Sequence, residues 1–471
     1  MDPVPAAEPD AQRSRSLLYA AALGLVLLAA VAAYLVLANQ DLWSTGQASA
    51  SSPATESAGA PDPPRIVQGR VLDADSGAPI RGASIWVGAV EARSDAEGRF
   101  TVERPDAQTT LIVKASGYER KRVVPERSAL TVILAPKVVR AAYLTYYGVG
   151  DRAIRGRVLD LIGRTELNAV VIDVKGDRGL IPYRTQVAAA LEAGAQGPVI
   201  IKDFDALLAG LRERGVYTIA RIVAFKDNVL AQRRPDLAII DTRTGKPWLD
   251  RENLAWVDPF REEVWDYLIA IAREAAEKGF DEIQFDYVRF PTDGRLAAAR
   301  YSQPNGSATR LPAITAFLAK ARRELGSTGV FLAADIFGYT AFNPNDTDIG
   351  QRIEELAPHL DYICPMVYPS GYHLGIPGYR NPVEHPYEIV RESVKLIRQR
   401  SQHASVVVRP WLQDFRDYAF DRRPFGVREI RAQMKGAAES GAVGYMLWNP
   451  RNDYTAEALP PKTVSIRRVS E

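Results

Sequence analysis

Two aspartates end apolar runs of the sequence, and they are the strongest candidates for chemistry in this chain. Asp286 closes the run IQFD, and Asp335 closes the run FLAAD. A carboxylate beside apolar neighbours costs free energy unless the protein needs it there. Cleavage of a glycosidic bond requires two carboxyl groups, one to protonate the leaving oxygen and one to attack the sugar carbon or activate water. We therefore predict that Asp286 and Asp335 form a catalytic pair.

The neighbours of the two aspartates suggest different roles. Arg289 follows Asp286 by three residues, and its charge would hold Asp286 ionised as a nucleophile. Asp335 has apolar residues on both sides, which would raise its pKa and suit it to the role of general acid. Asp414 is a candidate for a third, stabilising carboxylate. The alternative is that Asp286 and Arg289 form a structural ion pair that seals the mouth of a barrel.

Other polar and aromatic residues stand where apolar runs end. A sugar offers hydroxyl edges and apolar faces, which call for carboxylates, amides, arginines and flat rings. The predicted substrate-binding residues are Tyr147, Asp173, Lys175, Arg221, Arg289, Tyr368, Trp411, Gln413, Trp448 and Asn449.

The sequence predicts no cofactor and no metal. One cysteine and four histidines form no cluster with the ligand spacing of zinc, and Cys364 lies in an apolar run typical of a buried, inert thiol. Metal-assisted hydrolysis through Asp173, Asp286 and Asp335 is an alternative that no histidine supports.

A repeated pattern over residues 138–456 must position these candidates. An apolar run followed by an amphipathic stretch occurs seven times, and the apolar run GAVGYMLWNP closes the series as the eighth. This alternation predicts right-handed βαβ units and a (β/α)8 barrel, with the active site at the carboxyl ends of its strands. A doubly wound sheet is the alternative fold, but Gly148-Val149-Gly150 lacks the third glycine of its phosphate-binding fingerprint.

Strands four and five of this barrel would carry the two aspartates. Neighbouring strands lie about 4.8 Å apart. Carboxyl groups at equal height would then be nearer the roughly 5–5.5 Å of retaining enzymes than the 6.5–9.5 Å of inverting ones. The spacing favours hydrolysis with retention of configuration.

The residues before the barrel divide into four segments. Residues 65–136 alternate apolar and polar positions in short runs between turn sequences, which predicts a small β-sandwich. Residues 39–64 are small, polar or proline and predict a disordered linker. Residues 17–38 are apolar and uncharged over a length that spans a bilayer, so they predict a transmembrane helix after a tail at 1–16. A second tail is expected at 457–471.

The flanks of the apolar segment orient it. Arg13 and Arg15 precede it, so the tail should be cytoplasmic and the rest of the chain extracytoplasmic, anchored to the cell membrane. A cleaved signal peptide is the alternative, with Ala48-Ser49-Ala50 as its small-residue site. The 59 basic and 57 acidic residues give a net charge of +2, which offers no electrostatic reason for a nucleic-acid partner.

Two segments resemble known families. The segments GRVLDADSGAPIRGASIWV and VKASGYERKRV resemble the carboxypeptidase regulatory-like domains. These domains have a transthyretin-like fold and usually serve as a stalk or a binding accessory. The segments IQFDYVRFPTDG, VFLAADIFGY, YICPMVYPSGY, RPWLQDF and GYMLWNP resemble the bacterial family of putative glycoside hydrolase domains, which is distantly similar to the α-amylase class.

The second resemblance implies roles for three aspartates. In the amylase-type pattern the nucleophile ends strand four, the acid ends strand five and a stabilising aspartate follows strand seven. The matching positions are Asp286, Asp335 and Asp414. The chain departs from that pattern in having Asp335 where the acid is usually Glu, and Gln284 where an arginine usually stands. The strand-four signature DxxDxDxE of chitinase-type barrels is absent.

Together these features predict a membrane-anchored glycoside hydrolase that acts on an extracellular or cell-envelope polysaccharide. The alternative is a non-catalytic polysaccharide-binding or envelope-organising protein.

Overall fold

The structure is a computed structural model that describes residues 66–104, 106 and 108–462. The predicted cytoplasmic tail (1–16), transmembrane helix (17–38) and linker (39–64) lie outside the described residues, as does most of the tail at 457–471. Within the described part, no helix has the length and apolar character needed to cross a membrane. Residues 62–471 form one compact unit that holds an all-β region and a barrel.

The all-β region is the predicted sandwich. One sheet has the order β4-β1-β7 and the other the order β3-β2-β5-β6. Alternate residues of β1 and β4 face a common core, where Val67, Val71, Phe100 and Val102 are buried. The strands are β1 (Ile66–Asp73), β2 (Ser84–Val87), β3 (Val90–Arg93), β4 (Arg99–Glu103), β5 (Leu111–Lys114), β6 (Lys121–Val123) and β7 (Ala129–Leu134).

Eight parallel strands form a closed barrel, so the doubly wound alternative is wrong. Around the barrel the order is β8-β9-β10-β12-β14-β15-β17-β18, and it closes because β18 pairs with β8 and β14 pairs with β15. Short β16 (Val407–Val408) continues the pairing of β15 at its amino end. The barrel strands are β8 (Val139–Leu144), β9 (Ala169–Lys175), β10 (Tyr217–Val223), β12 (Glu282–Asp286), β14 (Phe331–Phe337), β15 (Tyr362–Met366), β17 (Trp411–Gln413) and β18 (Gly444–Trp448).

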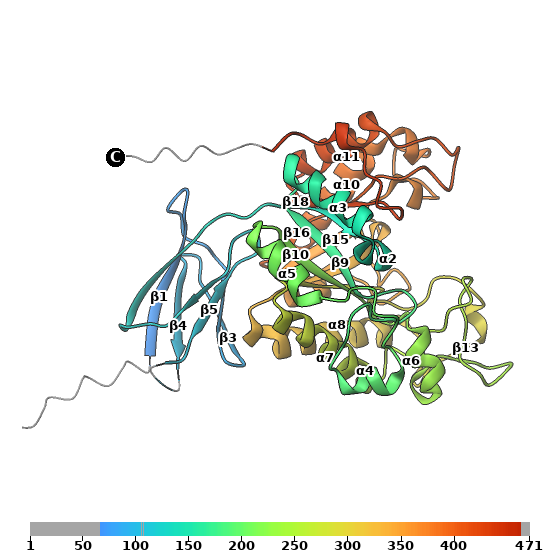
Figure 1. Cartoon of the computed structure of the whole chain (residues 1–471), viewed down its shortest axis with the longest axis horizontal. Coiled ribbons are helices and arrows are strands. Elements are labelled where there is room, and N and C mark those ends of the chain that lie inside the picture. The colour runs from blue at the N-terminus through green and yellow to red at the C-terminus, as the bar shows by residue number, and fades with distance from the viewer. Residues whose placement is uncertain (1–65, 105, 107, 463–471) are drawn as a thin grey trace, which may run out of the picture. The chain divides into compact units, whose positions relative to one another are not determined.

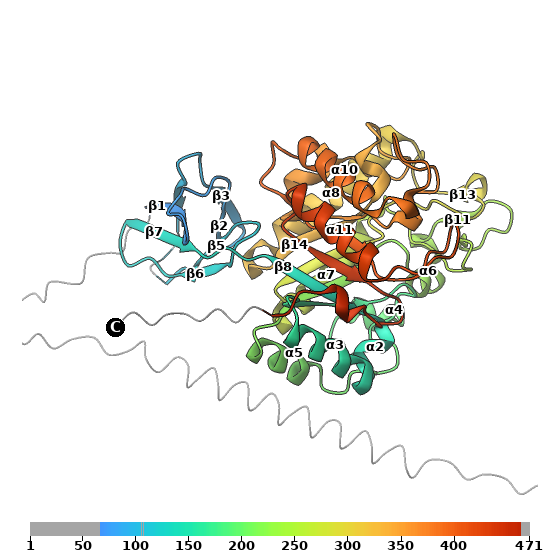
Figure 2. The ribbon, with the colours of Figure 1, turned by 90° about the horizontal axis from the view of Figure 1, so that it is seen from above.

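Helices surround the strands (Figures 1 and 2). Aspartates cap the amino ends of three of them, because Asp151, Asp203 and Asp227 accept from backbone N–H groups that have no partner within the helix. The main helices are α3 (Arg152–Arg164), α5 (Phe204–Glu213), α7 (Glu262–Lys278), α8 (Ser307–Leu325), α10 (Pro386–Arg400) and α11 (Val427–Glu439), and the shorter ones include α2 (Tyr146–Gly150), α4 (Ala188–Ala193), α6 (Asn228–Arg233) and α9 (Ile353–Leu356).

The inside of the barrel is packed, and its polar groups pair with one another. Arg409 and Glu282 form a fully buried ion pair, and the guanidinium lies 4.2 Å from the centre of the Tyr362 ring. Cys364 is buried beside this pair, and burial raises the pKa of its thiol. Side chains therefore fill the inside of the barrel at this level.

The sandwich contacts the barrel at the amino ends of its strands. Lys114 of β5 donates to Asp361, which directly precedes β15, over 2.7 Å. Arg322 of α8 bridges Asp361 and Glu91 of β3. These groups are largely buried, so the two folded regions share a polar interface at the end of the barrel away from the strand carboxyl ends.

Candidate active site

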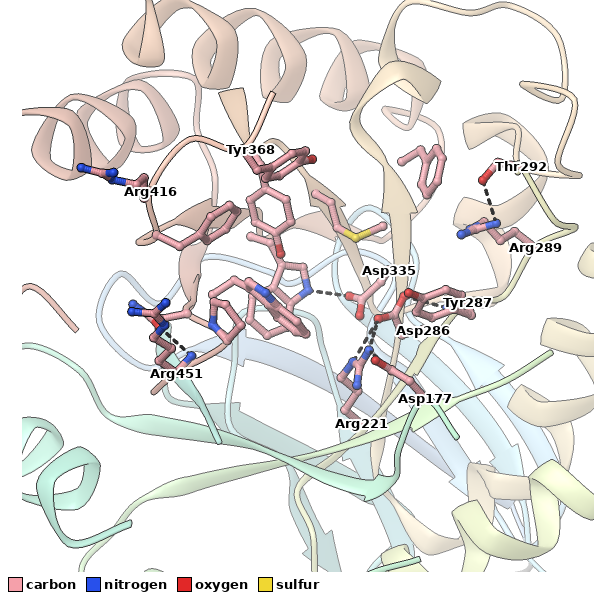
Figure 3. Close-up of a pocket in the computed structure, with 18 of the residues that line it drawn as sticks. Asp177, Arg221, Asp286, Tyr287, Arg289, Thr292, Asp335, Tyr368, Arg416 and Arg451 are labelled. Atoms are coloured by element: carbon pink, nitrogen blue, oxygen red, sulfur yellow. Dashed lines mark hydrogen bonds and ion pairs between the residues drawn. The ribbon is translucent and has the colours of Figure 1, made fainter. Parts of the chain in front are cut away.

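The two predicted catalytic aspartates lie at the same height on neighbouring strands. The pairing of β12 with β14 places Phe285 opposite Ala334, so Asp286 and Asp335 are next in register and face the same side. Both side chains are buried and both line one cavity (Figure 3).

Asp286 is held by donors to both of its oxygens. Arg221 donates to Oδ2 from Nε at 3.0 Å and from Nη2 at 2.6 Å. The backbone N–H of Tyr287 donates to Oδ1 at 2.6 Å. Tyr287 has φ of 49°, a left-handed conformation that a residue with a Cβ seldom adopts. Each oxygen of Asp286 therefore accepts at least one hydrogen bond.

Asp335 has the opposite environment. Its side chain is nearly fully buried and its Oδ1 accepts one hydrogen bond, from Trp411 Nε1 at 2.7 Å. Burial, and then the nearby charge of Asp286, raise the pKa of Asp335 well above its ordinary value. The two carboxyl groups therefore have different environments, because Asp286 accepts from several donors and Asp335 is buried with one.

Arg221, and not Arg289, is the ion-pair partner of Asp286. Arg221 comes from the middle of β10, where it also pairs with Asp173 at 2.7 Å and Asp177 at 3.1 Å. Burial would lower the pKa of Arg221, but these carboxylates outweigh it and the pKa is raised. The alternative of an Asp286–Arg289 ion pair is wrong, and Arg289 acts on Asp286 only at longer range, because strand pairing brings Arg221 nearer than three residues along the chain bring Arg289.

The cavity has a volume of about 820 Å³ and opens at the carboxyl ends of the strands. Trp448 stacks on Tyr143 at 4.1 Å, and Arg221 lies 5.2 Å from the Trp448 ring centre. Six of the predicted substrate-binding residues line the cavity: Arg221, Arg289, Tyr368, Trp411, Trp448 and Asn449.

Two more predicted residues line a smaller cavity next to the first. Tyr147, exposed at 69%, and the buried Asp173 lie in the lining of this space of about 240 Å³. Asp177, Trp448 and Pro450 belong to both linings, so the two cavities adjoin.

Three predicted residues are not brought to either cavity. Lys175 is fully buried in an ion pair with Asp227 at 2.8 Å. Gln413 is buried and donates to Ser370. Asp414 accepts from the backbone and side chain of Thr455, and burial raises its pKa to about 6. Each residue stands near a strand end, as predicted, but its side chain binds a partner in a loop or on a neighbouring strand.

Most of the cavity residues that the sequence did not identify come from loops. Apolar runs reveal strand ends, but no periodicity shows which loop residue turns inward. The sequence FPTDG after β12 and the aromatic segment after β17 were the available signals. These residues are Tyr287, Thr292, Asp293, Phe337, Met366, Phe415, Arg416, Tyr418, Pro450, Arg451 and Asp453.

The three aspartates of the metal-assisted alternative do not converge on one point. The Arg221 guanidinium donates to both Asp173 and Asp286. Over the described ranges, no three acidic, histidine or cysteine side chains are grouped as metal ligands.

A closed parallel barrel with a polar and aromatic cavity at its strand ends is the architecture of the barrel enzymes. The chain belongs to the family described as "putative glycosyl hydrolase domain", whose model matches residues 141–454. Residues 66–135 match the carboxypeptidase regulatory-like domain. Both predicted resemblances are confirmed, and the chain carries a glycosyl hydrolase domain after an all-β region.

Several solved structures are similar to this chain, and one with a TM-score of 0.50 shares its fold. The PgaB (BpsB) glycoside hydrolase domain from Bordetella bronchiseptica is 15% identical, with a TM-score of 0.50 over 69% of this chain and 100% of that one. A hypothetical protein from Ruminiclostridium thermocellum is 39% identical over 41% of this chain and 96% of its own, with a TM-score of 0.36. A chitinase from Chromobacterium violaceum is 12% identical over 68% and 98%, with a TM-score of 0.40. No curated protein matches the chain.

Proposed function

We propose that this chain hydrolyses glycosidic bonds of an extracellular or cell-envelope polysaccharide, with Asp286 as nucleophile and Asp335 as general acid. The observation that carries the proposal is the contrast between the two carboxyl groups. Arg221 and the Tyr287 backbone donate to the two oxygens of Asp286, whereas burial raises the pKa of Asp335. An acid and a nucleophile of this kind are what glycosidic cleavage needs.

The hydrogen bonds support a choice of atoms for the proposed first step. Asp335 Oδ1 accepts from Trp411, so the acidic proton resides on Oδ2 and is free to move to the leaving oxygen. As the bond from the anomeric carbon to that oxygen breaks, a carboxylate oxygen of Asp286 forms a bond to the anomeric carbon. A water molecule then gives its proton to Asp335 and its oxygen to that carbon, which releases Asp286.

The strand register supports retention of configuration. Asp286 and Asp335 occupy equal positions on adjacent strands, which lie about 4.8 Å apart. That spacing suits the roughly 5–5.5 Å between the carboxyl groups of retaining enzymes. We further propose that the apolar segment 17–38 anchors the enzyme to the membrane, with the barrel outside the cytoplasm.

The test is hydrolysis of a panel of cell-envelope polysaccharides by the full-length chain, with products identified by mass spectrometry. Asp286→Asn and Asp335→Asn should each lower the rate about 100- to 10,000-fold. Asp236→Asn, which alters an exposed ion pair, should leave it unchanged. Asp335→Asn should regain activity on an aryl glycoside whose leaving group needs no proton, whereas Asp286→Asn should not.

The early product should have the anomeric configuration of the substrate when observed by NMR. Inverted product would remove Asp286 as nucleophile and leave it as the base. Binding of a polysaccharide without any product, in the native chain, would favour the non-catalytic alternative.

A further inference from the structure

We infer that Arg289 binds a carboxylate carried by the sugar chain, so that the substrate is an acidic polysaccharide containing uronic acid residues. That the bound sugar chain is a substrate rests on the proposed function. The anion site itself depends on Arg289 alone. Arg289 lines the large cavity and its side chain is 8% exposed.

Arg289 differs from the other buried arginines of the barrel. Arg221, Arg310, Arg322 and Arg409 each form an ion pair with at least one carboxylate. Within the described part of the chain, no carboxylate forms an ion pair with Arg289. A buried charge without a counter-ion is costly, so a protein that keeps one at a cavity wall gains a site for an external anion.

The acidic groups nearest to Arg289 are engaged elsewhere. Asp286 is held by Arg221, as described above. Asp250 pairs with Lys226 at 3.1 Å and accepts from Trp256 Nε1 at 3.0 Å. Asp293 accepts from the backbone N–H of Arg251 at 3.2 Å. These three aspartates attract Arg289 at longer range, but none of them forms an ion pair with its guanidinium.

Aromatic rings hold the guanidinium in place. Its carbon lies 4.6 Å from the ring centre of Phe337, 4.9 Å from that of Tyr287 and 5.1 Å from that of Trp256. Rings at this distance recover part of the solvation that burial removes. The rigid, apolar surroundings would strengthen the attraction of an anion that enters.

The hydrogen bonds of Arg289 leave one edge of its guanidinium, formed by Nε and Nη2, available to a ligand. Nη1 donates to the Phe290 carbonyl at 2.9 Å and to Thr292 Oγ1 at 3.5 Å. Among the described residues, Nε and Nη2 have no hydrogen-bond acceptor. Two parallel N–H groups on one edge match the two oxygens of a planar carboxylate.

The position of Arg289 places this anion beside the reacting bond. Figure 3 shows Arg289 and Thr292 on one side of the aspartate pair, with Arg416 and Arg451 on the opposite side. All of them line the same cavity. A sugar bound across the pair would therefore carry its carboxylate toward Arg289.

The test is binding of three uronates, each compared with its neutral parent sugar, to the full-length chain by calorimetry. The pairs are glucuronate and glucose, galacturonate and galactose, and mannuronate and mannose. We expect at least one uronate to bind tenfold more tightly than its parent. This preference should disappear in Arg289→Gln. It should fall in Arg289→Lys, which keeps the positive charge but loses the two parallel N–H groups of the guanidinium. It should persist in Arg295→Gln, which changes an exposed arginine of the same loop.

Thermal unfolding provides a second measurement. Because Arg289 has no internal counter-ion, Arg289→Gln should unfold at the same temperature as the native chain or higher, while the preferred uronate should raise the unfolding temperature of the native chain only. The inference is overturned if no uronate is preferred, if the preference survives Arg289→Gln, or if inorganic phosphate binds as well as the uronate.

The two proposals fail separately. A uronate preference that depends on Arg289, without hydrolysis of any polysaccharide, would uphold the anion site and reject the enzyme. Hydrolysis of neutral polysaccharides that depends on both aspartates, without a uronate preference, would uphold the enzyme and reject the anion site.

Discussion

At the scale of single residues, the environment of each carboxyl group matters more than its type. Asp286 and Asp335 are the same amino acid at equal heights on adjacent strands. Arg221 donates two hydrogen bonds to the first, while the carboxyl group of the second accepts, among the described residues, from Trp411 Nε1 alone. The same carboxyl chemistry therefore stands in two different environments, which is the arrangement that an acid paired with a nucleophile requires.

This contrast predicts opposite effects on stability for the two asparagine variants. The folded-state pKa of Asp335 is raised, so its contribution to stability is complete below about pH 3.9 and is lost as the pH rises through the folded-state pKa. At pH 8 the unfolded native chain ionises Asp335 more readily than the folded chain does, a cost to stability that Asp335→Asn lacks. We expect the unfolding temperature of Asp335→Asn to exceed that of the native chain by about 2–4 °C at pH 8, and by less at pH 4.

Asp286→Asn is the matched control for this measurement. It removes one partner of a buried ion pair while Arg221 keeps Asp173 and Asp177, so it should destabilise by about 1–3 kcal/mol at pH 8. Calorimetric scans at both pH values measure the difference. A stabilising effect of Asp286→Asn would contradict the assignment of its ionised state.

At the scale of elements, closure of the barrel positions the site. The carboxyl ends of β10, β12, β14, β17 and β18 supply the core of the cavity, and only a closed sheet brings β18 beside β8. Gly444 begins β18 with φ of 84°, and a Cβ there would lie 1.9 Å from the Val139 carbonyl oxygen. The residue thus permits the last strand to pair with the first.

Gly444→Ala should therefore destabilise the chain by about 3–5 kcal/mol, through left-handed backbone strain and the clash with β8. Chemical unfolding measures this loss. Gly156→Ala in α3 is the control, because no atom lies within 4 Å of its Cβ position, and it should stabilise by about 0.5–1 kcal/mol. An equal effect of both substitutions would show that strand closure does not depend on Gly444.

At the scale of the whole molecule, the sandwich is joined to the barrel by buried charges. Asp361 accepts from Lys114 of the sandwich and from Arg322 and the Leu332 N–H of the barrel. Trp86 of the sandwich is buried where a Cβ on Gly326 of the barrel would lie 2.3 Å from its ring. Such contacts lead us to expect that the two regions unfold together.

Asp361→Asn should cost about 3–5 kcal/mol, because it leaves the buried Lys114 without its counter-ion. Calorimetry of the full-length chain should still show one transition at a lower temperature. The exposed ion pair of Arg99 with Asp95 provides the control, and Asp95→Ala should cost less than about 1 kcal/mol. Two separate transitions in the native chain would contradict the shared unfolding unit.

The sequence by itself determined the family, the sandwich, the eight strands and the position of the aspartate pair. Those features depend on local patterns, since apolar runs and turn residues are read along the chain. Asp286 and Asp335 were found because a carboxylate ends each buried run. The roles proposed for them remain predictions that the experiments above test.

Only the tertiary structure decided which side chains reach the pair. Arg289 is close to Asp286 in sequence, yet Arg221 of the neighbouring strand binds it, while Lys175, Gln413 and Asp414 turn to other partners. The physical reason is that a barrel brings together residues from different strands and loops. Sequence separation does not measure that proximity, and the direction of a loop side chain depends on all the groups packed around it.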